Sequence, residues 1–213
     1  MKERSPLRVG IAGLGAVGLD VARRLIAGVP GLTLAAVAVR DAEKAKRALP
    51  EIGNGVALRG LADIAENCDV IVEVLPPALF REIAVPVIEC GRIFMPLSVA
   101  QLLEHGDLVE SAKRSGARIV VPTGALLGLH AVRAAAEGTV HSVTMVTRKP
   151  PAGLEGAPYL REHGITLAGL REPRKVFEGS ARDGARGSKS GRTPASRATR
   201  TPSRSMPTPS GSR

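Results

Sequence analysis

The sequence predicts an α/β fold: a doubly wound parallel sheet, then an incomplete α+β domain and a disordered C-terminal tail. Three observations predict it. From Leu7 to Val121, short β-branched or apolar runs alternate with stretches of helical period, as in repeated βα units. A glycine-rich turn follows the first run. The chain is 44% hydrophobic but only 2% aromatic, without Trp, and an aliphatic core suits a parallel sheet covered by helices.

The elements of the first half follow from this alternation. The connections are short, and right-handed crossovers then generate a doubly wound sheet. Pro86 should kink or split the helix that contains it, because proline lacks the amide donor. We expect strands over residues 8–12, 32–39, 70–74, 92–95 and 118–121, and helices over 17–27, 61–66, 78–89 and 103–115.

A second pattern starts near Gly124. It comprises a helix over 127–137, a two-faced alternating strand over 140–148 and a further strand over 175–178. Residues 188–213 hold no Leu, Ile, Val or aromatic residue, so nothing there offsets the entropy lost on ordering. We therefore expect a doubly wound domain over 1–123, the start of an α+β domain over 124–187, and a disordered basic tail over 188–213.

The formal charge of +10 is concentrated in that tail. Six of the 30 basic residues and none of the 20 acidic residues lie in residues 188–213. The tail has no aromatic interleaving and no groove-reading element, so we expect no specific nucleic-acid partner.

Two cysteines, Cys68 and Cys90, cannot build a disulfide framework, and neither lies in a metal-binding motif. No apolar run reaches membrane-spanning length, and the N-terminus leads directly into a strand and turn. We expect a cytoplasmic protein with reduced thiols, without a membrane or metal site.

The glycine turn carries the clearest functional signal. Gly13, Gly15 and Gly18 fit the pattern G-x-G-x-x-G, with Ala16 and Val17 opening the helix. In a strand-turn-helix setting this is the Rossmann fingerprint: a tight turn, close backbone approach to a pyrophosphate, and close packing of helix on strand. The helix N-terminus presents free N–H groups to the diphosphate. We predict NAD or NADP binding at these residues.

The end of the second strand leaves the choice of cofactor open. An acidic residue there would bond the adenosine 2′-hydroxyl, but Arg40 takes that place and Asp41 follows. Arg40 either receives a 2′-phosphate or is a solvated loop residue, with Asp41 as an N-cap.

From about Leu7 to Gly187 the chain resembles L-aspartate dehydrogenase of the kind associated with NAD biosynthesis. The resemblance rests on the glycine turn together with VEVLPP at 72–77, PTGALLGL at 122–129, KPP at 149–151 and VFEGS at 176–180.

The resemblance implies reversible oxidative deamination of L-aspartate by NAD(P), giving iminoaspartate and then oxaloacetate plus ammonia. It implies that Ala125 makes a backbone contact on the nicotinamide side of the cofactor. Glu73 either lines the cofactor cleft or caps the turn before Pro76. A complete second domain would also permit a homo-oligomer.

The chain departs from the family pattern in two ways. His130 stands where the family usually has aspartate. After Gly187 the expected Phe-Pro with spaced asparagines, and then Asn-x-His with the proposed acid/base histidine, do not follow. We therefore assign no catalytic residue, and expect a chain truncated or frameshifted after Gly187 with impaired activity.

The other histidines are weak substitutes for the missing one. They are His105, His130, His141 and His163, of which His141, on a predicted strand, is the least implausible base. The alternatives are a non-catalytic NAD(P)-binding remnant, or a related Rossmann dehydrogenase such as homoserine dehydrogenase.

Overall fold

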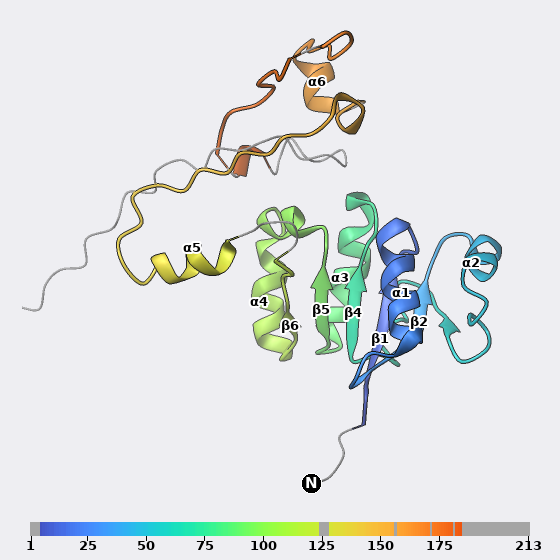
Figure 1. Cartoon of the computed structure of the whole chain (residues 1–213). Helices are drawn as coiled ribbons and strands as arrows, with labels where there is room; N and C mark the ends of the chain where they lie inside the picture. The colour runs from blue at the N-terminus through green and yellow to red at the C-terminus, as the bar shows by residue number, and fades with distance from the viewer. Residues whose placement is uncertain (1–4, 124–127, 156, 171, 181, 185–213) are drawn as a thin grey trace, which may run out of the picture. The chain divides into compact units, whose positions relative to one another are not determined.

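The computed structural model describes residues 5–123, 128–155, 157–170, 172–180 and 182–184 (Figure 1). The chain divides into two compact units, residues 1–124 and 125–213. Each is described here by itself.

The first unit contains a six-stranded, fully parallel sheet with the order β3-β2-β1-β4-β5-β6 (Figure 1). The order reverses direction between β1 and β4, which is the arrangement of a doubly wound sheet. The predicted doubly wound parallel sheet is confirmed. The strands are β1 (Leu7–Ala12), β2 (Leu32–Ala38), β3 (Ala57–Leu58), β4 (Val70–Glu73), β5 (Ile93–Pro96) and β6 (Arg118–Ile119).

Helices cover both faces of this sheet, and each face has its own apolar cluster. One cluster packs α3 and α4 residues such as Phe80, Ile83 and Leu108 on the sheet. The other packs Leu25 of α1 and Leu49, just after α2, against β1 and β2. The helices of this unit are α1 (Ala16–Gly28), α2 (Ala42–Ala48), α3 (Phe80–Glu89) and α4 (Gly106–Ser115), with 3₁₀ turns η1 (Pro77–Leu79) and η2 (Val99–Leu103).

Strand β4 lies at the centre of the sheet, and all four of its residues are buried. Phe94, on the neighbouring strand β5, packs against Phe80 of α3. Both side chains are fully buried, and their ring centroids are 5.8 Å apart. That spacing falls in the range that tilted aromatic pairs prefer. The aliphatic core expected from the composition thus has one aromatic pair at its centre.

One local prediction for this unit was wrong, and one of two alternatives is excluded. Residues 61–66 form turns, with one i to i−4 bond from Ile64 N to Gly60 O, because a segment of this length does not become helical by propensity alone. A kink at Pro86 stays a prediction, but α3 is not split and continues through Pro86. The buried residues on both sides of it, including Ala84 and Val87, offset the lost backbone hydrogen bond.

The second unit contains α5 (Leu129–Ala135), η3 (Pro151–Gly153) and α6 (Pro158–Glu162). Residues 140–148 and 175–178, predicted as strands, are not strands in the structure, apart from a single bridge position at Thr144. A lone strand is not stable in water without partners. Val146 is 74% exposed, so this apolar side chain is not covered within the described part of the unit.

No helix among the residues that the structure describes is long and apolar enough to cross a membrane.

A carboxylate joins β1 and β4 at the amino edge of the sheet. Asp69 accepts hydrogen bonds from the Arg8 backbone N–H at 2.8 Å and from the Arg8 guanidinium at 3.4 Å. The backbone bond first, and then the side-chain bond, lower the pKa of Asp69 below its usual range. A lowered pKa in the folded state means that the pair stabilises the fold above the ordinary aspartate pKa and is lost as pH falls through the lowered value.

We therefore expect Asp69→Asn to lower the free energy of unfolding by less than about 1 kcal/mol at neutral pH, since the pair is partly exposed and the amide oxygen can still accept from the backbone. Urea denaturation at about pH 7 and about pH 3 checks this, and the difference between variant and wild type should shrink at the lower pH. A difference that grows on acidification would contradict the assignment.

Candidate functional site

The turn between β1 and α1 is fixed by close backbone contacts. Gly13 has φ of +101°, and its N–H donates to the Ala38 carbonyl at 2.9 Å. A Cβ placed on Gly13 would lie 2.5 Å from the Val74 carbonyl oxygen. Both the conformation and the space therefore require glycine here. The turn consequently touches the segment that follows β4.

Gly18, in the first turn of α1, makes the second close approach. A Cβ on this residue would overlap the Gly13 carbonyl oxygen. The helix can therefore pack directly on the turn only because the side chain is absent. This fixes the direction of α1 over the end of β1.

Gly15 differs from both, because apart from its two chain neighbours no described residue has an atom within 4 Å of its would-be Cβ. It is the N-cap of α1, with no side-chain cap and no acidic residue in the first turn. The amides of Ala16 and Val17 have no acceptor within the helix, and both residues are exposed. Open space, free donors and the positive end of the helix fit the diphosphate of a dinucleotide.

The loop after β2 separates the two predicted roles of Arg40 and Asp41. The Asp41 carboxylate accepts from the Lys44 backbone N–H at 2.9 Å and caps α2. Arg40 is exposed, and within the described ranges of the chain it has no ion pair or hydrogen bond. The N-cap role of Asp41 is confirmed, while the contact of Arg40 with a cofactor stays a prediction.

The structure adds Arg59 to the same edge of the sheet. Strand β3 pairs with β2 so that Leu58 lies opposite Val37, and the Arg59 N–H donates to the Val37 carbonyl at 2.9 Å. Arg59 is exposed and follows β3 as Arg40 follows β2. No pattern in the sequence pointed to this residue, because the two-residue strand β3 was not predicted.

Glu73 ends β4, and its side chain is fully buried. One carboxylate oxygen accepts from the Leu75 N–H at 2.8 Å, and the other from the Ser98 N–H at 3.0 Å. The structure thus bears out the turn-capping alternative. Direct contact of Glu73 with a cofactor stays a prediction, and the buried side chain does not favour it.

The remaining predicted residues are described each within its own unit, except Ala125. Ala125 is outside the described residues. His105 stacks on Phe80 at 6.0 Å and His163 on Tyr159 at 4.0 Å. His130 and His141 are exposed. Among the described residues no group of three or more His, Cys, Asp or Glu side chains could hold a metal ion.

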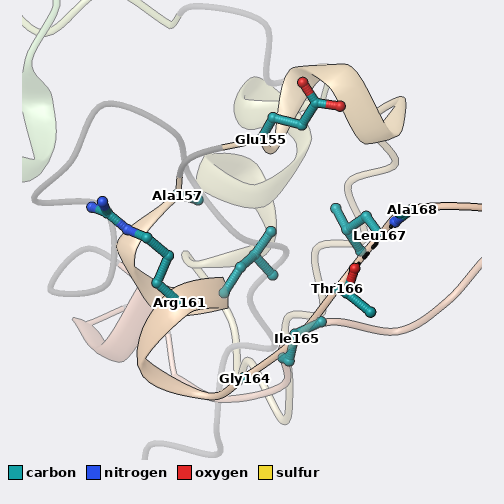
Figure 2. A pocket seen from close by; sticks show the side chains of 9 residues that line it. Glu155, Ala157, Arg161, Gly164, Ile165, Thr166, Leu167 and Ala168 are labelled. Carbon is teal, nitrogen blue, oxygen red and sulfur yellow. Dashed lines mark hydrogen bonds between the residues drawn. The ribbon is translucent and has the colours of Figure 1, made fainter.

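The second unit has a hollow of its own around α6, with a volume of about 380 Å³ (Figure 2). Its wall includes Leu160 and Ile165, and Thr166 accepts from the Ala168 N–H at 3.4 Å. In Figure 2 the Arg161 guanidinium points away from Thr166. This hollow is mainly apolar and has no histidine in its lining.

Two family models match the chain. The homoserine dehydrogenase NAD-binding domain matches residues 13–122, and the aspartate dehydrogenase C-terminal domain matches residues 130–187. L-aspartate dehydrogenase of Bradyrhizobium diazoefficiens is 47% identical over 183 residues, 86% of this chain and 65% of that protein. L-aspartate dehydrogenase 3 of Bordetella bronchiseptica is 44% identical over 188 residues, 88% and 69% of the respective chains. The chain belongs to the L-aspartate dehydrogenase family.

The chain spans about two thirds of the length of these relatives, 65% and 69%. Residues 188–213 lie outside both family matches. Apo scyllo-inositol dehydrogenase of Lactobacillus casei has a similar fold, with a TM-score of 0.54 at 16% identity over 70% of this chain and 48% of that one. The glycine turn therefore lies in an NAD-binding domain of an aspartate dehydrogenase family member.

Because Gly15 faces open space and Gly18 faces backbone, substitutions at the two positions should affect cofactor binding and fold stability differently. We expect Gly15→Ala to change the free energy of unfolding by no more than about 1 kcal/mol, because its Cβ enters open space at a permitted φ. It should nevertheless weaken NAD(P)H binding at least about tenfold, since the methyl group occupies the space of the diphosphate. Fluorescence titration of the nicotinamide and thermal unfolding measure the two effects.

Gly18→Ala serves as the matched comparison. Its Cβ meets backbone rather than open space, so we expect it to destabilise the fold by about 2 kcal/mol or more. Equal stability of the two variants would contradict the described packing of the turn.

Proposed function

We propose that this chain binds NAD(P) at the glycine turn and serves the reaction of the aspartate dehydrogenase family. A cofactor held by the glycine turn would supply a hydride acceptor for the oxidation of L-aspartate. Loss of the hydride from Cα and of a proton from the amine would give iminoaspartate, which water would convert to oxaloacetate and ammonia. The geometry of Gly13, Gly15 and Gly18, in a chain 44% identical to a protein of that name, is the observation that carries the proposal.

We further propose that the residues of this chain alone give little turnover. The resemblance places the acid/base histidine beyond the segment 176–180, and residues 188–213 contain neither histidine nor asparagine. His141, the remaining candidate, is exposed on a segment without regular strand structure. A base must reach the reacting group within hydrogen-bond distance, which an unsupported side chain achieves poorly.

The expected result is cofactor binding without efficient aspartate oxidation. Fluorescence titration with NADH and NADPH measures binding. The rate of L-aspartate-dependent reduction of NAD⁺ and NADP⁺ measures turnover, with L-homoserine as the comparison substrate. Turnover typical of an enzyme, on the order of 1 s⁻¹ or faster, would refute the loss of activity. Faster reduction with L-homoserine would favour the homoserine dehydrogenase alternative.

The edge of β2 and β3 supports NADP over NAD. The adenosine ribose of a dinucleotide meets the end of the second strand, where an acid selects NAD and a cation accommodates the 2′-phosphate. Arg40 and Arg59 follow these two strands, while the nearby Asp41 carboxylate already caps α2. We propose that the chain prefers NADP to NAD.

We also propose a cytoplasmic location, in keeping with the free thiols of Cys68 and Cys90.

Arg40→Ala should weaken NADPH binding about fivefold to tenfold and leave NADH binding within about twofold, because only NADPH carries the 2′-phosphate. Arg47→Ala is the matched control, since Arg47 is an exposed arginine in the last turn of α2. It should leave both dissociation constants unchanged. An equal loss for NADH and NADPH in Arg40→Ala would contradict the specific role of Arg40.

A further inference from the structure

Glu73 occupies the position at which the strand order of the sheet reverses. It pairs with Ala12 at the end of β1 on one side and with Pro96 at the end of β5 on the other. In doubly wound sheets the ligand crevice opens at this reversal, outside the carboxyl ends of the strands. A buried carboxylate thus lies directly beneath the proposed dinucleotide crevice.

The carboxylate binds two loops at once. Oε1 accepts from the Leu75 N–H at 2.8 Å and from the Ser98 hydroxyl at 3.1 Å, and Oε2 accepts from the Ser98 N–H at 3.0 Å. The Leu97 N–H also donates to the Glu73 carbonyl at 3.0 Å. Within the described residues Glu73 has no ion pair with a cation. The loops after β4 and β5 are therefore joined through one side chain.

The loop held in this way forms a wall of the glycine turn. The Val74 N–H donates to the Ala12 carbonyl at 2.8 Å. The Val74 carbonyl oxygen and a Leu75 methyl lie 2.5 Å and 3.3 Å from a Cβ built on Gly13. Any displacement of residues 74 and 75 must therefore change the room left for the turn.

Both carboxyl oxygens of Glu73 have to act as hydrogen-bond acceptors. The two backbone N–H groups of Leu75 and Ser98 point at different oxygen atoms of Glu73. An amide offers one acceptor and one NH₂ donor, so glutamine would set a donor against a backbone N–H. A buried donor left without an acceptor is destabilising, and the loop can relieve this by moving away.

We propose that Glu73, together with Ser98, is a positioning residue: it holds the loop 74–76 against the glycine turn and so fixes the crevice in the shape that accepts the dinucleotide. This inference rests on the proposed function for its ligand. It does not require Glu73 to touch the cofactor. It accounts for a fully buried carboxylate at the one edge of the sheet where a ligand is expected.

The test uses the full chain with the variants Glu73→Gln, Ser98→Ala and Ser98→Thr. Asp69→Asn is the matched control. The Asp69 carboxylate also accepts a hydrogen bond from a backbone N–H of the sheet, but at the opposite edge. Nicotinamide fluorescence gives the dissociation constants of NADH and NADPH at a temperature where every variant is folded. Hydrogen exchange of the loop 74–79 in the cofactor-free protein reports whether the loop is held.

We expect Glu73→Gln to weaken binding about tenfold or more and Ser98→Ala by about threefold to tenfold, with faster exchange in the loop. Ser98→Thr keeps the hydroxyl and should restore binding to within about twofold of the wild type, while Asp69→Asn leaves it unchanged. If Glu73→Gln does not fold, the Ser98 pair decides the question.

Wild-type affinity in Ser98→Ala, with unchanged loop exchange, would overturn the positioning role while the proposed function stands. Equal weakening by Asp69→Asn would overturn it as well, because the effect would then reflect general stability. A wild-type protein that binds neither NADH nor NADPH would overturn the proposed function, and this inference with it.

Discussion

The close approach of backbone to backbone around the first glycine turn is the constraint on which the nucleotide-binding half depends. Gly13 lies against the Val74 carbonyl, and Gly18 lies against the Gly13 carbonyl. These contacts bring the N-terminus of α1 over the junction of β1 and β4, where the strand order reverses. Free helix amides, open space and the carboxyl ends of the strands coincide there. A side chain at either position would separate these features.

Two carboxylates support this half from opposite edges of the sheet, and their surroundings differ. Asp69, at the amino edge, is partly exposed and has a guanidinium partner. Such pairs contribute little to stability. Glu73, at the carboxyl edge, is fully buried and bonded only by hydroxyl and backbone donors in the described structure. A buried carboxylate is unfavourable unless its hydrogen bonds are well satisfied, so the geometry of these bonds is better explained by a demand for shape at the crevice than by a gain in stability.

The sequence sufficed for those features whose cause is local. Alternating apolar runs located five strands of the sheet, and the glycine spacing located the turn, since both depend on residues close in the chain. Strand β3 has two residues and exists because it pairs with β2. A strand this short has no detectable periodicity, so neither β3 nor the position of Arg59 could be predicted. For residues 140–148 the error was the opposite, because a strand was predicted and none formed. Their alternation is typical of a strand, but a strand needs partners, and the described structure supplies only an isolated bridge at Thr144.

The two halves of the chain therefore differ in what supports them. The first unit has an apolar cluster on each face of its sheet, which is sufficient to hold the glycine turn and the Glu73 loops in place. In the described part of the second unit, α5 has no buried residue, and Val140, Val143 and Val146 are exposed. The proposed cofactor site therefore has a packed core directly behind it. The segment that carries His141 has no such support among the described residues, since its valines are exposed.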